Sequence, residues 1–216
     1  YVSHAVYGGN DFGGHIGVNN TSSKLYENIT VPDGTKNVRT QTYVKYVSGK
    51  IGRAIYGGSY GSYEYTHAIY GDLTNHTYPT IIATVSKQDG DPDGTILTNT
   101  FVDIASTSKS PEDVIGSDNS ESVLTMLAGG GRGYKGLPQH VEVRQTYLLL
   151  HGESYANRNN QLMAHRVYGG GNLSKVGDTR IDAYSGSFGQ IFGGTHGVKT
   201  AVAGDLAASY DCENTT

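Results

Sequence analysis

The sequence lacks most of the residues that fill a broad protein core. Among its 216 residues there is no tryptophan, and there are only four phenylalanines, one cysteine and five prolines. The single cysteine, Cys212, excludes an internal disulfide framework. The few prolines and the absence of a Gly-X-Y period exclude a collagen-like helix. Charged residues make up only 17 % of the chain, which is too few for a disordered segment.

Several classes of partner are also disfavoured. The net charge is −4 and the 16 lysines and arginines are scattered, so we expect no nucleic-acid partner, because such proteins cluster their cations. No run approaches the ~18 apolar residues of a membrane span. No signal peptide is visible after Tyr1, and the chain does not begin with methionine. We therefore interpret it as a processed product or a fragment of a longer chain.

Glycine and tyrosine are the abundant residues, at 31 and 17 positions. A glycine in a helix interior costs about 1 kcal/mol relative to alanine, so this composition disfavours a helical protein. Glycines are arranged in a recurring phrase that consists of an aliphatic residue, an aromatic residue and two or three glycines. The copies are HAVYGG at 4–9, RAIYGG at 53–58, HAIYGD at 67–72, HRVYGGG at 165–171, IFGG at 191–194 and a degenerate LAGGG at 127–131.

The spacing of these phrases predicts the fold. Tyr168 and Phe192 are 24 residues apart, and Tyr7 and Tyr56 are 49 apart, close to twice that distance. Alternating runs typical of strands lie at 42–47, 141–147 and 179–184. We expect an all-β fold, a right-handed parallel β-solenoid (β-helix) of about 24 residues per coil, formed by 1–216 as a single domain with glycine at turns that need φ > 0. An irregular β-sandwich with glycine-rich hairpins is the alternative.

Three stretches interrupt the repeat, and we expect them to be insertions: residues 19–40, 72–122 and 152–162. The second contains two strand-like runs, at 80–85 and 100–104. Insertions in repeat proteins often gather on one side, and that side is often used for binding.

Some phrases resemble those of a known group of proteins. VYGGND at 6–11, VGDT at 176–179 and SGSFGQIFGG at 185–194 are similar to the Gly-rich β-helix repeats of large secreted or cell-surface proteins of Bacteroidetes-type bacteria. The likeness is clearest over 165–197 and poor across 72–122. It implies a β-helix fold and an extracellular or cell-surface location, and it carries no catalytic residue.

A candidate calcium loop is formed by Asp89, Asp91 and Asp93, which alternate before Gly94. Calcium prefers several oxygen ligands, and alternating carboxylates can converge on one ion. The twelfth position of the loop is Thr100 instead of glutamate, which weakens the pattern. A solvated acidic turn is the alternative interpretation.

Tyr60, Tyr63 and Tyr65 form a candidate binding site in a strand-like run. An exposed row of tyrosines can stack on sugar rings or pack against a protein partner, because a phenol joins apolar area to a polar tip. The alternative is that these rings pack inside the fold.

The remaining polar residues give weaker signals. His4, His67 and His165 occupy one position of the repeat, where Arg53 stands in another copy, and we expect a structural or surface role for them. A glycosidase needs two nearby carboxylates. The acids weighed for that role are Asp103, Glu142 and Asp182.

No G-x-S-x-G motif is present, and the only cysteine lies near the end of the chain, so we expect no enzyme. The sequence predicts a secreted or cell-surface structural or adhesin-like scaffold that displays loops for binding glycans or a surface protein. Two alternatives stay open. One is a polysaccharide-active enzyme or tailspike-like glycan binder, and the other is a fibre subunit that self-associates through its open ends.

Overall fold

The computed structural model describes residues 2, 4–10, 25–49, 51–61, 80–105, 126–133, 141–152 and 163–197, and the backbone alone of 212–215. Every regular element in these ranges is a β-strand. The strands are β1 (Ala5–Tyr7), β2 (Leu25–Val31), β3 (Gly34–Tyr46), β4 (Ala54–Tyr56), β5 (Thr80–Ile81), β6 (Ile96–Ile104), β7 (Met126–Ala128), β8 (Glu142–Leu150), β9 (Ala164–Tyr168), β10 (Lys175–Ala183), β11 (Phe188–Phe192) and β12 (Cys212–Thr215). In this described part no helix could cross a membrane.

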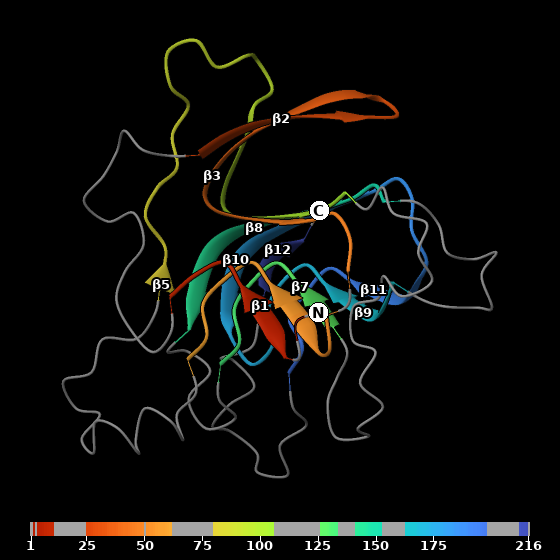
Figure 1. Cartoon of the computed structure of the whole chain (residues 1–216). Coiled ribbons are helices and arrows are strands. Elements are labelled where there is room, and N and C mark those ends of the chain that lie inside the picture. Colours follow the sequence, from red (N-terminus) through yellow and green to blue (C-terminus); the bar gives the residue numbers. More distant parts are fainter. Residues whose placement is uncertain are drawn as a thin grey trace, which may run out of the picture.

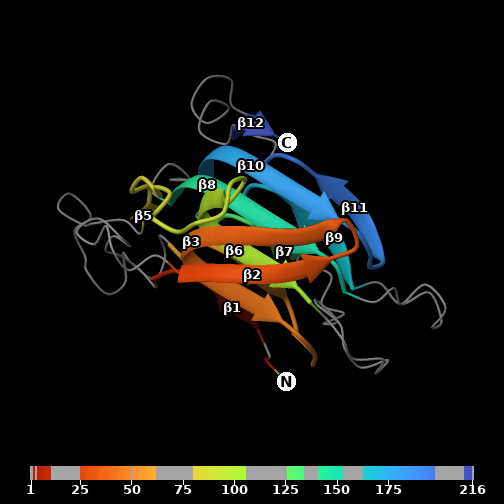
Figure 2. The same ribbon diagram turned by 90° about the horizontal axis from the view of Figure 1, so that it is seen from above.

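The strands form two sheets. The five-stranded sheet has the order β1-β4-β7-β9-β11, and all of its pairs are parallel. The seven-stranded sheet has the order β12-β10-β8-β6-β3-β2, with β5 also pairing β8, and only β2 and β3 are antiparallel. Figure 1 shows the sheets as two layers with the β2–β3 hairpin arching over one of them, and Figure 2 looks down on that hairpin.

The right-handed parallel β-solenoid expected from the spacing is wrong. The structure has two sheets, one of them mixed, and its described residues do not close into a solenoid. The uniform period of 24 is also wrong. Paired positions are separated by 49, 72, 40 and 24 residues along the ladder Val6, Ile55, Leu127, Val167 and Ile191. Parallel pairing fixes how two strands are aligned but not the length of the chain that connects them. Connections of unequal length are tolerated because the entropic cost of closing a connection rises only slowly with its length.

The predicted strands are found, and the expected insertions are partly strands too. The runs at 42–47, 141–147 and 179–184 fall largely in β3, β8 and β10. The run at 100–104 lies in β6, whereas the run at 80–85 is a strand only in β5. Within the expected insertion 19–40, residues 25–40 form β2 and the start of β3; within 72–122, β6 is a central strand between β3 and β8. Residues 67–72 and 153–162 lie outside the described residues.

The core lies between the two sheets. In four described copies of the glycine phrase, the aliphatic residue points inward from the five-stranded sheet and meets aliphatic residues of the other sheet, because alternate side chains of a strand face opposite sides. These residues are Val6, Ile55, Leu127 and Val167. Full burial of such a side chain stabilises the fold by about 1.5–3 kcal/mol. The fully buried members of this cluster include Ile55, Val102, Ile104, Leu127, Leu148, Leu150 and Val167.

Hydrogen bonds from four buried threonines connect the sheets. Thr42, Thr100, Thr146 and Thr179 occupy matching positions of β3, β6, β8 and β10. The Oγ1 atom of each donates to the carbonyl of the first glycine after a strand of the other sheet. The acceptors are Gly57, Gly129, Gly169 and Gly193, at 2.7–2.8 Å.

The glycines of the phrase are required by this close approach. Among the described glycines, positive φ occurs only at Gly34, Gly49, Gly90, Gly94 and Gly186, and none of these belongs to the phrase. The expectation of left-handed turns at the phrase is therefore wrong. A Cβ on Gly129 would collide with the Gly169 carbonyl and with Leu148, and it would lie 2.8 Å from Cβ of Thr146.

The threonine bonds predict a specific loss of stability. Thr146→Val keeps the shape of the side chain but leaves the buried Gly169 carbonyl without its donor. We expect the free energy of unfolding to fall by about 1–3 kcal/mol in urea titrations. The exposed Thr35→Val is the matched control, and we expect it to change stability by less than about 0.5 kcal/mol. Equal effects of the two substitutions would contradict the role of this bond.

Candidate functional site

The outer side of the five-stranded sheet carries a row of aromatic rings. In the described copies of the phrase, the aromatic residue points away from the core between the sheets, and the rings lie in register. Tyr7 stacks on Tyr56 with centroids 5.0 Å apart and planes 7° apart. Tyr168 stacks on Phe192 in the same way, at 5.0 Å and 12°. Ala128 stands at the ring position of β7, so the row has a gap between its two stacked pairs.

A second row follows directly after the glycines. Tyr60, Arg132, Asn172 and His196 are joined by isolated parallel bridges, one residue from each successive layer. Neighbours in such a row are about 4.8 Å apart along the sheet. All four are half-buried.

Side-chain contacts join the two rows. Tyr60 packs on Tyr7 at 5.1 Å, and the Arg132 guanidinium lies 5.5 Å from the centre of the Tyr60 ring. The Asn172 amide donates to the Tyr56 hydroxyl at 3.3 Å.

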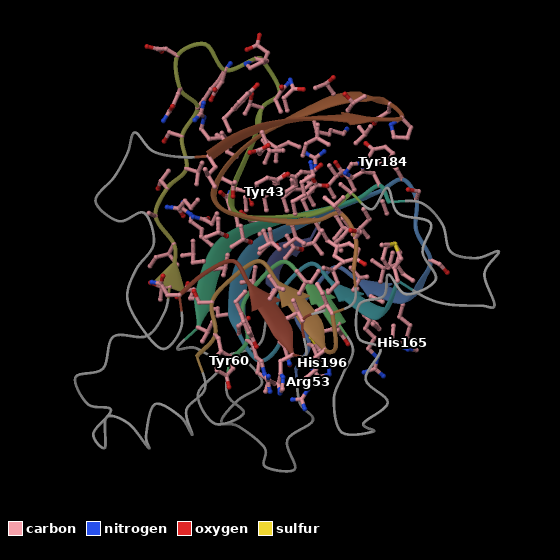
Figure 3. The ribbon with its side chains drawn as sticks, viewed as in Figure 1. Tyr43, Arg53, Tyr60, His165, Tyr184 and His196 are labelled. Carbon is pink, nitrogen blue, oxygen red and sulfur yellow. The ribbon has the colours of Figure 1, made fainter. Side chains whose placement is uncertain are left out.

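At the other end of the rows, His196 Nδ1 lies 3.0 Å from Asn172 Oδ1, and the His196 ring meets the Tyr168 ring edge-on at 5.2 Å. We call this surface the aromatic–polar face. Its members are Tyr7, Tyr56, Tyr60, Arg132, Tyr168, Asn172 and His196. Figure 3 shows Tyr60 and His196 on one side of the molecule, opposite Tyr43 and Tyr184.

Burial sets the charge of this face. It raises the pKa of the Tyr7 and Tyr56 hydroxyls above the ordinary range, so both stay protonated. Burial, followed by the positive charge of Arg166, lowers the pKa of His196. At neutral pH the imidazole is therefore uncharged, with one donor and one acceptor nitrogen. The face offers hydroxyl, amide and imidazole groups together with the guanidinium of Arg132, and the positive charge of Arg166 lies close to His196.

The predicted tyrosines and histidines divide as follows. Tyr60 belongs to the face, whereas Tyr63 and Tyr65 lie outside the described residues, as does His67. Arg53 pairs with His4 through a backbone hydrogen bond of 2.8 Å. His4 and His165 are exposed; His165 lies in β9, whereas His4 directly precedes β1, which is not a neighbour of β9. No group of three His, Cys, Asp or Glu residues able to hold a metal occurs in the ranges given above.

The candidate calcium loop does not bring its three carboxylates together. Asp91 forms a bidentate pair with Arg39, with Nε 2.6 Å from Oδ2, and its side chain is only 4 % exposed. Asp93 pairs with Lys87 at 2.7 Å on the surface. The hydrogen bond from Arg39 lowers the pKa of Asp91 to about 2. Asp91 therefore fastens the loop to β3.

The ion pair between Asp91 and Arg39 predicts how the free energy of unfolding depends on pH. The pKa of Asp91 is about 2 in the folded chain, below the ~3.9 of an unfolded aspartate. Its contribution to stability is therefore complete above about pH 4 and is lost as the pH falls toward 2. We expect Asp91→Asn to lower the melting temperature at pH 7, and the difference from the wild type to shrink at pH 2.

The exposed Asp93→Asn is the control and should have little effect at either pH. A calcium titration in the same assay tests the sequence hypothesis directly. A rise in melting temperature that Asp91→Asn abolishes would show that the loop binds calcium.

The outer side of the seven-stranded sheet has an aromatic row of its own, which sequence reasoning did not identify. Tyr43, Phe101 and Tyr147 stack with centroids 5.1 Å apart, and the Arg180 guanidinium lies 5.4 Å from the Tyr147 ring centre. The sequence does contain a signal for this row, namely the alternation of side chains in β3, β6 and β8, which places the three rings on one face of the sheet. The hairpin covers the row, packing its apolar residues against Phe101, Tyr147 and Leu149. The hairpin residues that make this contact are Ile29, Val31 and Val38.

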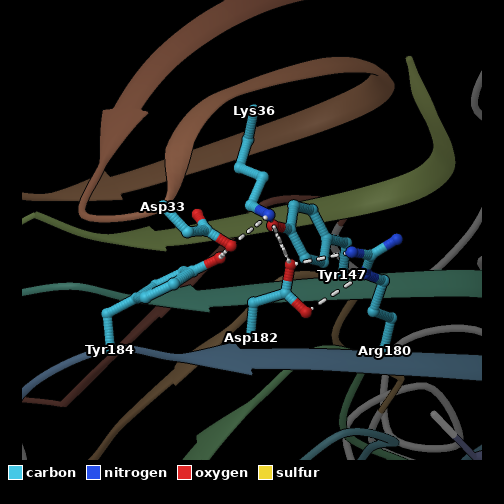
Figure 4. Close-up of polar contacts among 6 residues, drawn as sticks. All are labelled: Asp33, Lys36, Tyr147, Arg180, Asp182 and Tyr184. Atoms are coloured by element: carbon cyan, nitrogen blue, oxygen red, sulfur yellow. Dashed lines mark hydrogen bonds and ion pairs between the residues drawn. The ribbon is translucent and has the colours of Figure 1, made fainter. Parts of the chain in front are cut away.

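A polar latch holds the hairpin tip on β10 (Figure 4). Asp33 accepts a hydrogen bond of 2.8 Å from the Tyr184 hydroxyl, which lowers the pKa of that carboxyl. Lys36 lies 3.2 Å from Asp33 and 4.0 Å from Asp182. Asp182 also accepts from the Tyr147 hydroxyl at 2.9 Å.

The acids weighed for catalysis each have a separate partner. Asp103 is fully buried and accepts from Tyr43 at 2.9 Å, while its second oxygen lies 2.6 Å from His151 Nε2. Glu142 pairs with Lys175 at 3.1 Å. Asp103 and Asp182 are in register, but Leu149 of β8 separates them.

No protein-family model matches this chain, and no curated protein or solved structure is significantly similar to it. The function is therefore argued from the side chains. Of the surfaces described above, the aromatic–polar face combines rings, neutral hydrogen-bonding groups and cationic guanidinium groups. The aromatic row of the seven-stranded sheet is covered by the hairpin.

Proposed function

We propose that this chain is an extracellular structural and adhesive module that binds a glycan along the aromatic–polar face. The observation that carries the proposal is the alignment of Tyr60, Arg132, Asn172 and His196 in successive layers of a parallel sheet. Such a row presents an extended, evenly spaced set of groups. A linear chain of sugars has the same character, since its hydroxyls and ring faces repeat along its length.

The chemistry of each group suits a sugar. The Tyr60 ring supplies apolar area with a polar tip. Asn172 and neutral His196 each donate and accept, as sugar hydroxyls do. Arg132 adds a planar set of donors. The deeply buried Tyr56 and Tyr168 support the row from below, at 3 % and 5 % exposure.

We propose binding in preference to catalysis because the acids weighed for catalysis are already engaged. Asp103 is buried against His151 and Tyr43, and Asp182 is bonded to Tyr147 and Arg180. The extracellular or cell-surface location is likewise a proposal, and the glycine phrases that resemble those of Bacteroidetes-type surface proteins support it.

A glycan array with the whole chain tests the proposal. We expect Tyr60→Ala to weaken binding of any glycan retained by the wild type by about fivefold or more, because it removes the stacking ring. Tyr60→Phe should keep most of the affinity. Tyr26→Ala is the matched control, since Tyr26 is a 37 % exposed tyrosine on the hairpin.

Melting curves for each variant separate loss of binding from loss of fold. Retention of the glycan by Tyr60→Ala, or no glycan bound at all, would overturn the proposal. Release of reducing or unsaturated ends from a bound polysaccharide would identify an enzyme instead.

Self-association is the second candidate, and the edge strand β11 favours it. Its Ile191 and Phe192 are 46 % and 40 % exposed. The opposite edge, β1, carries the matching pair Val6 and Tyr7, so the two edges are complementary in a head-to-tail contact.

Sedimentation velocity at increasing concentration tests this candidate. If the wild type forms oligomers, Ile191→Lys should leave it monomeric, because a charge on the edge opposes strand pairing. The exposed Val47→Lys is the control. A wild type that stays monomeric at millimolar concentration would exclude this candidate.

A further inference from the structure

A second polar site lies on the other sheet, beneath the hairpin. A cavity of about 440 Å³ separates Asn28–Thr30 of β2 from Lys45, Val47, Ala105 and His151. Its volume is within the range of small-molecule sites, roughly 300–1,000 Å³.

The strand register builds the floor of this cavity. Val47, Ala105 and His151 directly follow the last residues of β3, β6 and β8. The ladder continues through them, since Ala105 N donates to the Tyr46 carbonyl at 2.8 Å and His151 N to the Ile104 carbonyl at 3.1 Å. The carboxyl ends of three parallel strands therefore meet at one place, which is where open parallel sheets commonly bind ligands.

Buried groups hold the His151 ring in one orientation. Its Nε2 lies 2.6 Å from an oxygen of Asp103, which is fully buried and also bound by the Tyr43 hydroxyl. Nε2 is thus occupied, and Nδ1 is the ring nitrogen left for a ligand. With the proton on Nε2, Nδ1 accepts a hydrogen bond from a hydroxyl.

Lys45 is an exposed cation that forms no ion pair with the residues that the structure describes. Among the described lysines, Lys36, Lys87 and Lys175 each pair with a carboxylate, whereas Lys45 has no ion-pair partner there. It lies at the cavity, next in register to Asp103. An ammonium group in this position attracts an anionic group of a ligand.

The edge strand β2 also lines the cavity. Since β2 ends its sheet, alternate backbone N–H and C=O groups of Asn28–Thr30 point away from β3. The Asn28 side chain lies on the opposite face of β2 from the buried Ile29 and bonds Asn37 there at 3.0 Å, so the backbone groups are the ones that a ligand can reach. These groups match the hydroxyls of a sugar.

We propose that this cavity binds an acidic sugar residue, with its carboxylate on Lys45 and its hydroxyls on His151 Nδ1 and the edge of β2. A neutral sugar lacks the anion, and an inorganic anion lacks the hydroxyls. This site is separate from the aromatic–polar face, and it does not depend on the function proposed for that face.

Isothermal titration of the whole chain tests the site. The probes are tetrasaccharides of galacturonate, glucuronate and mannuronate, the methyl ester of each, and sodium sulfate. We expect at least one uronate to bind, its methyl ester and sulfate to bind at least tenfold more weakly, and added salt to weaken binding. Lys45→Met should reduce the affinity about tenfold or more, because the charged hydrogen bond is lost.

Three further variants complete the design. His151→Gln should weaken binding severalfold, Lys87→Met should have no effect, and Tyr60→Ala should leave uronate binding intact. Melting curves check that each variant is folded. The proposal is overturned if no uronate binds, if the methyl ester or sulfate binds as well as the acid, or if Lys87→Met has the same effect as Lys45→Met. Loss of uronate binding in Tyr60→Ala alone would assign it to the aromatic–polar face and would also overturn the proposal for the cavity.

Discussion

The bond between a buried threonine hydroxyl and a glycine carbonyl is the constraint on which the rest of this structure depends. It recurs four times, from Thr42, Thr100, Thr146 and Thr179, and each bond crosses from one sheet to the other. The acceptor must be a glycine, because a Cβ at Gly129 would collide with its neighbours. The two sheets therefore approach each other closely along the row of threonines and glycines. The positions of the residues on either side of the glycines follow from this close approach.

Both candidate sites follow from this geometry. The residue that follows the glycines in each layer is aligned with its counterpart in the next, which produces the row from Tyr60 to His196. On the other sheet, three of the strands that carry the threonines, β3, β6 and β8, end in register, and the residues that directly follow them form the floor below the hairpin. The β2–β3 hairpin adds the edge strand β2, which lines the cavity.

The sequence predicted the strands better than their assembly. The repeated phrase identified β1, β4, β9 and β11 because each consists of alternating residues that end in glycine. It did not predict two sheets with connections of unequal length, since one short spacing was extended to the whole chain. The glycines were attributed to left-handed turns, whereas their φ values are negative and they are needed for space. That requirement depends on residues far away in the sequence.

The sites were less accessible from the sequence. Tyr60 was identified by its neighbours in an aromatic run, but its contacts with Arg132 and Tyr7 join residues more than fifty positions apart. The three aspartates of the acidic loop had the correct spacing for an ion, yet Arg39, which binds one of them, is far from the loop in the sequence. Likewise, Asp103 and His151 become a pair only through the register of β6 and β8.

The unequal connections have a consequence for how such a chain can change. Ile55 and Leu127 are neighbours in one sheet although 72 residues separate them, while Val167 and Ile191 need only 24. Connections of very different length can thus join adjacent strands without shifting the register of either sheet. Insertions and deletions between the strands can then accumulate while the side chains aligned on the sheets stay in place.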